Sequence, residues 1–384
     1  MAATGEGSKL SAPVWAELVG QERVVAQLES AVAGQMTHAW LFTGPPGSGR
    51  SNAALAFAAA LQCEQGGCGT CHSCTTAAAN SHPDIAIINT DGLSIGVDAA
   101  RDAVRRSALH PSLGRYQILV VEDADRLTDQ AANALLKSIE EPAPGTVWLL
   151  CAPAVEDVLM TIRSRCRPVL LRTPPVSAIA RLLHERDGLD LQVAQGAAAA
   201  SQGHIGRARA LARDSDARAR RTEILALAVR LRGLGDCVLA AKSIDDEATA
   251  RATVRCDELD ERELANLQQA WGVEERGRRP AGYAGALSAL TKEQDRRRKR
   301  MARDSIDGVL LDLLSVQRDV LSIQLGTGAD LINADAIAGI NSIAEHHSAE
   351  HTLAAIDAIV DCRVALSANA APQLALEHMM TRFL

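Results

Sequence analysis

Residues 37–62 read THAWLFTGPPGSGRSNAALAFAAALQ, and this stretch decides the fold of the first half of the chain. The apolar run AWLFT favours a short buried strand, and the Ala-rich and Leu-rich segment that follows favours a helix. Between them, residues 44–51 fit the spacing of a phosphate-binding loop, in which backbone N–H groups surround a phosphate at a helix N-terminus. An ordinary Gly/Pro turn is the alternative, but the strand before the loop and the helix after it favour the phosphate loop.

The phosphate loop departs from its usual pattern at one position, because Arg50 stands where lysine belongs. A guanidinium is longer and planar, so it cannot simply replace a compact ammonium between the β- and γ-phosphates. We expect nucleotide binding to survive, with ATP or ADP and Mg²⁺ as the ligands, while hydrolysis is weakened. The candidate nucleotide-binding residues of the loop are Gly44, Gly47, Ser48, Gly49, Arg50 and Ser51.

Further strands and helices alternate along the first half of the chain. DIAIINT at 84–90, YQILVVEDAD at 116–125 and TVWLLCA at 146–152 favour strands, and residues 97–110 and 130–141 favour helices. Such alternation is typical of a parallel sheet covered by helices on both faces. We therefore predict an α/β domain over residues 1–173.

The rest of the chain favours helix alone. Two prolines at 174 and 175 punctuate the sequence, and residues 174–214 fit a small helical lid domain. Residues 215–384 fit an all-α domain, broken by the insertion-like stretch GVEERGRRPAGYAG at 272–285. The basic run TKEQDRRRKRMARD at 291–304 is interpreted as a solvated helix end rather than as a DNA or partner patch.

Composition narrows the class of protein. The chain of 384 residues is 47% hydrophobic and 23% charged, values typical of globular domains. Its net charge of −7 argues against a protein that coats nucleic acid through bulk electrostatics. The N-terminus lacks a secretory pattern, and no stretch is apolar enough to span a membrane. We expect a cytoplasmic protein with no membrane partner.

Two acidic residues follow the strand that ends ILVV. Glu122 and Asp123 stand where a nucleotide site of this type has first an Asp that binds Mg²⁺ and then a Glu that positions the attacking water. Their order is therefore reversed. Exchanging the two side chains moves each carboxylate by about one C–C bond, and a misplacement on the order of 1 Å can cost roughly a hundredfold in rate. Together with Arg50, this pair predicts a weak or absent ATPase.

Four cysteines lie close together at residues 63–74, in the sequence CEQGGCGTCHSC. Cys63, Cys68, Cys71 and Cys74 supply four thiolates at a spacing that suits a structural, tetrahedral Zn²⁺ site. An iron–sulfur cluster also accepts four thiolates, but no second cysteine set accompanies this one. We predict zinc, with His72 as a bystander, and interpret the five scattered cysteines as small core residues.

A last candidate is Arg165 in TIRSRC, residues 161–166. Arginines at 163, 165 and 167 alternate with small residues, and we expect an extended segment in which they point in different directions. These arginines fit a basic connection that caps the sheet. They fit equally well an arginine finger, Arg165, that neutralises charge on a γ-phosphoryl group.

At these residues the chain resembles the bacterial DNA polymerase III clamp-loader family, a branch of the AAA+ proteins. The resemblance rests on GPPGSGRS, the cysteine cluster, SHPD at 81–84, LTDQAANALLKSIEEP at 127–142 and SRC at 164–166, and it covers roughly the first 210 residues. It implies an AAA+ domain, a lid and a C-terminal collar that serves oligomerisation. It also implies an accessory subunit of a DNA-directed DNA polymerase, in a hetero-pentamer with motor (gamma/tau) and clamp-opening (delta) subunits that places a sliding clamp on primer-template DNA.

Departures from the motor pattern indicate which kind of subunit this is. Besides Arg50 and the Glu122–Asp123 pair, Ala152 and Pro153 occupy the positions of a polar sensor, and Gly206 replaces a second-sensor arginine, as in the delta-prime pattern. SRC, which acts on a neighbour, is intact. The resemblance therefore implies a stator that supplies Arg165 in trans. A gamma-like motor and a zinc-dependent nucleic-acid-binding module remain the alternatives.

Overall fold

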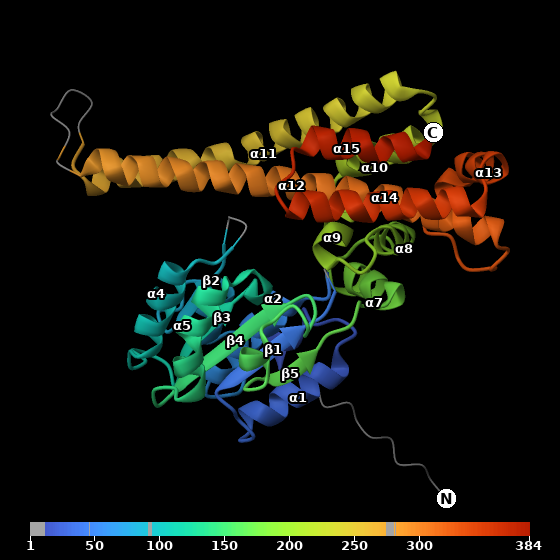
Figure 1. The fold of residues 1–384 in the computed structure, drawn as a ribbon. Helices are drawn as coiled ribbons and strands as arrows, with labels where there is room; N and C mark the ends of the chain where they lie inside the picture. Colours follow the sequence, from blue (N-terminus) through green and yellow to red (C-terminus); the bar gives the residue numbers. More distant parts are fainter. Residues whose placement is uncertain (1–11, 46, 91–93, 274–279, 281) are drawn as a thin grey trace, which may run out of the picture. The chain divides into compact units, whose positions relative to one another are not determined.

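The computed structural model describes residues 12–45, 47–90, 94–273, 280 and 282–384. Within them the chain forms two compact units, one ending at Arg213 and the other beginning at Asp214. The predicted fold class is confirmed: a parallel sheet with flanking helices is followed by a small helical segment and an all-α region (Figure 1). Pro46 of the phosphate loop and residues 274–279 and 281 of the insertion-like stretch lie outside the described residues.

The first unit is built on a five-stranded sheet with the order β2-β3-β4-β1-β5. All four strand pairings are parallel, and β1 is the central partner of both β4 and β5. The strands are β1 (Ala39–Thr43), β2 (Ile85–Ile88), β3 (Gln117–Val121), β4 (Thr146–Ala152) and β5 (Arg167–Leu170).

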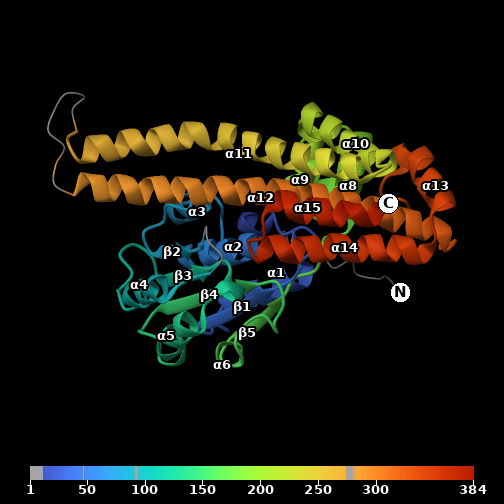
Figure 2. The same ribbon diagram turned by 45° about the horizontal axis from the view of Figure 1, so that its top comes forward.

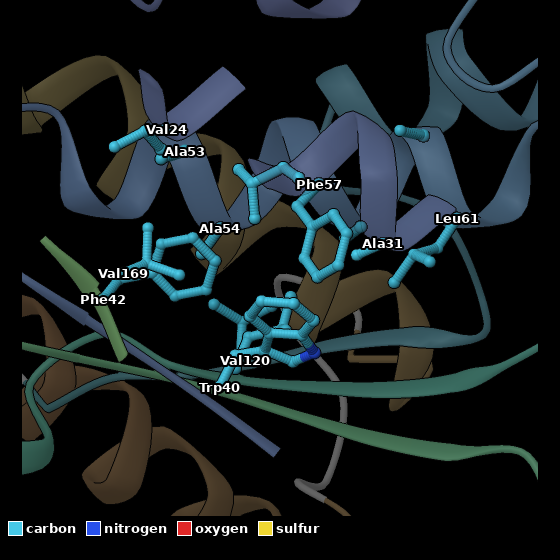
Figure 3. Packing of buried hydrophobic residues seen from close by; sticks show 14 of the residues in the cluster. Val24, Ala31, Trp40, Phe42, Ala53, Ala54, Phe57, Leu61, Val120 and Val169 are labelled. Carbon is cyan, nitrogen blue, oxygen red and sulfur yellow. The ribbon is translucent and has the colours of Figure 1, made fainter. Parts of the chain in front are cut away.

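Helices cover both faces of this sheet, as the alternating pattern predicts. They are α1 (Glu22–Val32), α2 (Arg50–Gln62), α3 (His72–Ala78), α4 (Val97–Ser107), α5 (Asp129–Glu140) and the short α6 (Met160–Arg163). Trp40, Phe42 and Phe57 form the centre of one core layer, between the sheet and α1 and α2 (Figure 3). The rings of Trp40 and Phe57 meet edge to face with centroids 5.0 Å apart, which gives this layer a fixed geometry.

The helical segment after the sheet belongs to the same unit. It comprises α7 (Val176–Arg181), which continues into one turn of π-helix (Leu182–Arg186), α8 (Leu191–Ala200) and α9 (Ile205–Arg213). Arg209 of α9 donates to Asp187 (Nε to Oδ2, 2.8 Å) and to Glu17 near the start of the described chain (Nη1 to Oε2, 3.1 Å). These ion pairs fix α9 and hold the guanidinium of Arg209 at Asp187 and Glu17.

In the part of the chain that the structure describes, the second unit contains helices and no strand. Its helices are α10 (Ser215–Arg230), α11 (Leu234–Ala270), α12 (Tyr283–Gln324), α13 (Ile337–His346), α14 (Ala349–Ser367) and α15 (Pro372–Met380). The long helices α11 and α12 lie side by side in both views (Figure 1, Figure 2). The first part of α11 and the second half of α12 join the core of this unit, which includes Ile244, Leu310 and Ile359.

Beyond this core, both ion pairs and small buried residues such as Ala252 and Cys256 join α11 and α12. Arg297 contacts Asp260 (2.6 Å) and Glu263 (2.5 Å), and Arg298 contacts Asp260 (2.5 Å). The basic run at 291–304 lies inside α12, so its interpretation as a helix end was wrong, and two of its arginines face acidic residues of α11.

Candidate nucleotide and metal sites

The segments of the candidate nucleotide site meet at the carboxyl ends of β1, β3 and β4. The loop follows β1 directly, and the N–H of Gly44 donates to the carbonyl of Pro153, just after β4 (3.2 Å). Glu122 follows β3, and its N–H donates to the carbonyl of Ile88 (3.0 Å). This edge of an open parallel sheet is where such folds bind ligands.

Glycines shape the loop itself. Gly47 and Gly49 have φ values of 84° and 86°, which L-residues with side chains rarely adopt. A Cβ on Gly47 would also lie 3.1 Å from the Cα of His204, the residue before α9. The loop therefore needs glycine at residue 47 for two reasons, and the helical segment approaches it closely at His204.

Several buried polar atoms around this loop have no hydrogen-bond partner among the described residues. They are Thr43 Oγ1, Ser48 Oγ, Arg50 Nη1 and Asp123 Oδ2. Buried polar atoms without partners are rare, and a cluster of them points to a ligand or ordered water that satisfies them. A guanidinium and two hydroxyls suit phosphate oxygens, and a carboxylate suits Mg²⁺, so this donor set fits a magnesium nucleotide.

The charges of the site surround Cys151, a buried residue of β4. Burial raises the pKa of its thiol to about 12, and Arg50, Glu122 and Asp123 all act on it electrostatically. The structure thus brings these three predicted site residues together. Burial likewise raises the pKa of Asp125, which Asp123 raises further and which Arg126 and Arg50 lower.

The two sensor positions carry no polar side chain, as the sequence indicates. Ala152 is the last residue of β4, and Gly206 lies in the first turn of α9. Thr43 and His204 are residues of this site that the sequence did not predict. Both could have been found from their places, since Thr43 directly precedes the loop and His204 lies within the motif GHIGRARAL.

The candidate metal site lies at the other end of α2. The Sγ atoms of Cys63, Cys68, Cys71 and Cys74 all lie within 4.8 Å of one another. Cys63 and Cys68 are 3.6 Å apart, and Cys63 and Cys71 are 3.8 Å apart, measured between sulfurs. Four thiolates at about 2.3 Å from a tetrahedral Zn²⁺ would be separated by about 3.8 Å, so the cluster could hold a metal ion of this kind.

Backbone amides support these sulfurs. The N–H groups of Cys68, Cys71 and Cys74 donate to the Sγ atoms of Cys63, Cys68 and Cys71, each at 3.4 Å. Amide hydrogen bonds from Thr70 and Cys71 lower the pKa of Cys68 to about 6. Burial raises the pKa of Cys74, and a bound cation would have to overcome this shift.

The other five cysteines are free thiols outside this cluster. Cys151, Cys237, Cys256 and Cys362 are buried, as expected of small core residues, and Cys166 is half-buried. Burial raises the pKa of Cys166 to about 12, so it too behaves as an apolar residue.

Arg165 does not lie on an extended segment, and this expectation was wrong. Residues 160–163 form helix α6 and residues 164–165 a turn, because the N–H groups of Arg163, Ser164 and Arg165 donate back along the chain. Arg165 is exposed, and its guanidinium contacts Glu140 of α5 (2.5 Å) and the carbonyl of Thr161 (2.6 Å).

Its neighbours differ in how they are held. Arg167 begins β5, and its guanidinium lies 5.0 Å from the centre of the Trp40 ring and donates to the carbonyl of Gln35. Arg163 is half-buried at the end of α6. Arg165 is thus the most exposed of the three, but whether it acts as a finger stays a prediction.

The SHPD motif at 81–84 has a structural explanation that the sequence did not provide. Asp84 is buried, and its carboxylate accepts from the N–H groups of Ser112, Leu113 and Gly114 at 2.6–2.8 Å. Burial alone would raise its pKa, but these hydrogen bonds outweigh it and lower the pKa to about 2. Asp84 therefore fixes the connection between α4 and β3.

Comparison with known proteins identifies relatives of both units. The family model described as DNA polymerase III, delta subunit, matches residues 20–175, and the model of the C-terminal part of that subunit matches residues 302–384. The delta-prime subunit of DNA polymerase III from Escherichia coli is 35% identical over 213 residues, which are 54% of this chain and 63% of that protein.

Motor-type relatives match as well. The gamma/tau subunit of DNA polymerase III from Mycobacterium tuberculosis is 38% identical over 175 residues, which are 44% of this chain and 30% of that protein. The crystal structure of a gamma subunit-related protein from Thermotoga maritima aligns with a TM-score of 0.42 and 17% identity, over 93% of this chain and 97% of that one. The match to the delta-prime subunit and the match to the gamma/tau subunit each span less than two thirds of that relative's length. Among the described residues, no helix is long and apolar enough to cross a membrane.

Proposed function

The chain belongs to the delta-prime group of the DNA polymerase III subunit family, and from this premise we propose that it works as the stator subunit of a clamp loader. In this role it helps motor and clamp-opening subunits to place a sliding clamp on primer-template DNA in the cytoplasm. It hydrolyses little or no ATP itself and completes the ATPase site of a neighbour. The domains of this stator are the AAA+ domain at 1–173, the lid at 174–214 and the collar at 215–384.

One contrast within the first domain supports this proposal. The residues that handle nucleotide depart from the motor pattern at Arg50, at Glu122 and Asp123, at Ala152 and at Gly206. Arg165, in contrast, is exposed and lies in a turn where a neighbouring subunit could reach it. A domain that has changed its own catalytic positions and kept an exposed arginine fits a role in trans.

The phosphate loop keeps a supporting role in this proposal. Its glycines and its unpaired buried atoms suit ATP or ADP with Mg²⁺, held without turnover by Gly44, Gly47, Ser48, Gly49, Arg50 and Ser51. The cysteine cluster holds a structural Zn²⁺, since four thiolates leave no coordination position for a reacting water.

Arg165 must leave Glu140 before it can reach a neighbour's nucleotide. The pair is 2.5 Å long, but both side chains are exposed, with 38% and 42% of their surfaces accessible. Exposed ion pairs contribute only about 0–1 kcal/mol, so a γ-phosphate of higher charge would compete for the arginine readily. The contact with Glu140 thus keeps Arg165 ordered without preventing its use.

Reconstitution with motor and clamp-opening subunits tests the function. We expect clamp loading to require this chain, and Arg165→Ala to reduce ATP turnover at the one site that this chain completes. A finger arginine contributes roughly a thousandfold or more in rate at its own site. Arg163→Ala is the matched control, because it removes a half-buried arginine two residues away and should leave loading unchanged.

Two outcomes would contradict the proposal. If Arg165→Ala supports loading as well as the unchanged chain while Arg163→Ala does not, the finger is assigned to the wrong residue. If the chain alone shows robust, DNA-stimulated ATP turnover that Arg50→Ala abolishes, it is a motor rather than a stator.

A further inference from the structure

The free edge of the sheet in the first unit carries a groove that the stator function does not use. Figure 1 shows β2 at the edge of the sheet, near helix α4. A cavity of about 550 Å³ is lined by residues of these two elements. Its wall from the sheet is formed by Ile87, Ile88 and Asn89. Its wall from the helical side is formed by Ala99, Asp102, Ala103, Arg105, Arg106 and Leu109.

The backbone of β2 offers unpaired groups at this edge. The carbonyls of Asp84 and Ile88 accept from N–H groups of β3 and of the residue after it, so every second residue of β2 faces β3. By this alternation the N–H and C=O of Ile87 point away from the sheet. Among the described residues, none has a hydrogen bond to these two groups. An edge of this kind is a template for an added strand.

The helix wall leaves room for side chains. Ala99, Asp102, Ala103 and Arg106 recur at intervals of three and four residues, so they share the face of α4 that lines the groove. Ala103 is buried in the core of its own unit, whereas Ala99 is exposed and Leu109, at the end of the groove, is 59% exposed. The groove therefore has an apolar floor that can hold aliphatic side chains.

The charge of the groove is basic, although the whole chain carries a net charge of −7. Arg105 forms an ion pair with Asp102 and is neutralised by it. Arg106 is exposed and has no ion-pair partner among the described residues. A single unpaired guanidinium beside an apolar floor suits a carboxylate that is carried by an otherwise aliphatic segment.

We propose that this groove binds an extended, acidic and aliphatic segment of a partner protein, which adds to β2 as a further strand. Backbone hydrogen bonds to Ile87 hold the segment, aliphatic side chains pack on the exposed Ala99 and Leu109, and a carboxylate pairs with Arg106. In such strand addition the main chain provides affinity, and the pockets for alternate side chains provide specificity. This interaction does not depend on nucleotide or on Arg165, so it stands or falls independently of the stator function.

The test uses the full chain and a fluorescein-labelled decapeptide that alternates valine with glutamate. We expect the anisotropy of this peptide to show saturable binding, and hydrogen exchange at the Ile87 amide to slow when it is bound. A decapeptide that alternates valine with lysine, and a valine–glutamate peptide N-methylated at every second amide, should bind at least about tenfold more weakly.

Two variants locate the site. Arg106→Glu should weaken binding by about tenfold or more, because it places like charges together, whereas Arg101→Glu on the same helix lies outside the groove and should have no effect. Ala99→Phe, an exposed helix position, should block the groove without affecting the fold, which circular dichroism checks.

The proposal is overturned by any of three results. The first is a valine–glutamate peptide that does not bind at about 1 mM, the weakest range of specific association. The second is an N-methylated peptide that binds as well as its parent, because strand addition then plays no part. The third is a DNA oligonucleotide that binds in an Arg106-dependent manner and displaces the peptide, which would make this an anion site for nucleic acid.

Discussion

The two ends of helix α2 carry two candidate sites that are built in opposite ways. At its C-terminus, Cys63 and the three cysteines that follow form a cluster within twelve residues, supported by amides of the same loop. At its N-terminus, the phosphate loop depends on residues that come from β1, β3, β4 and the segment before α9. The first site is local, and the second is assembled by the whole fold.

This difference predicts how each site responds to change. A local site keeps its geometry as long as its own loop keeps its ligand. Removing one of its ligating residues is therefore expected to abolish binding altogether. A site assembled from distant segments can lose one function and keep another, which fits a loop that binds nucleotide without hydrolysing it.

The largest expected effect is at the cysteine end. Cys71→Ser should remove the bound metal and destabilise the first unit by several kcal/mol, since metal binding and folding are coupled. A loss of this size should lower the Tm by roughly 10 °C. Cys71 also caps α3, because its side chain accepts a hydrogen bond from the N–H of Cys74. Serine is a good helix cap, so this variant removes the metal ligand and keeps the cap.

Metal content by mass spectrometry and thermal unfolding measure this effect. His72→Ala, in the same loop, is the matched control and should keep both metal and stability. Unchanged metal content in Cys71→Ser would show that the cysteine cluster is not the metal site.

A smaller effect is expected at Asp84, whose contacts reach 28 to 30 residues along the chain. Asp84→Asn should cost about 2–3 kcal/mol near pH 7, since its pKa of about 2 lies well below the unfolded value of about 3.9. Because the folded pKa is the lower one, this stabilisation is present above about pH 4 and is lost as the pH falls towards 2. The gap between variant and wild type should therefore close over that range.

Asp84→Asn also tests whether the cysteine cluster is independent of the rest of the fold. The variant should still bind one metal per chain, because the cysteine cluster depends on its own loop. Urea unfolding at several pH values and metal analysis of the same samples measure both effects. A variant that loses metal along with stability would show that the cluster is not local after all.

The smallest effect is expected at the nucleotide end. Arg50→Lys restores the usual loop residue, but Glu122, Asp123, Ala152 and Gly206 are unchanged, so ATP turnover should stay at background. ADP should raise the Tm of both proteins, as expected of a ligand that binds only the folded state. Robust turnover in the lysine variant would mean that a single residue accounts for the loss of activity.

The sequence predicted the parts of the molecule that are determined locally. The strand 146–152, helix α2 and the four-cysteine cluster could be placed because burial, helix propensity and metal-ligand spacing all operate over a few residues. The turn at Arg165 could not, since an alternating pattern of arginines does not distinguish an extended segment from a short helix and turn. Its contact with Glu140 joins residues 25 positions apart, and no short pattern contains that information.

The same limit applies to Asp84 and His204. SHPD was visible as a motif, but the three amides that Asp84 accepts from belong to a loop with no recognisable pattern of its own. His204 approaches Gly47 only because the helical segment folds back over the loop. Sequence can provide the residue types of such sites, and tertiary packing decides which of them meet.

The two long helices of the second unit have a mechanical consequence. The helix α11 is 37 residues long, or about 55 Å at 1.5 Å per residue, and its residues up to Ala248 contribute to the main hydrophobic core of this unit. Beyond that point ion pairs such as Arg297–Glu263 join it to α12 together with the buried Cys256, and added salt weakens ion pairs while it leaves apolar contacts intact. The stiffness of the helix pair around Glu263 and Arg297 should therefore depend on ionic strength. In concentrated salt, proteases should cut α11 and α12 near these two residues before they cut the part of the helices that lies in the main core.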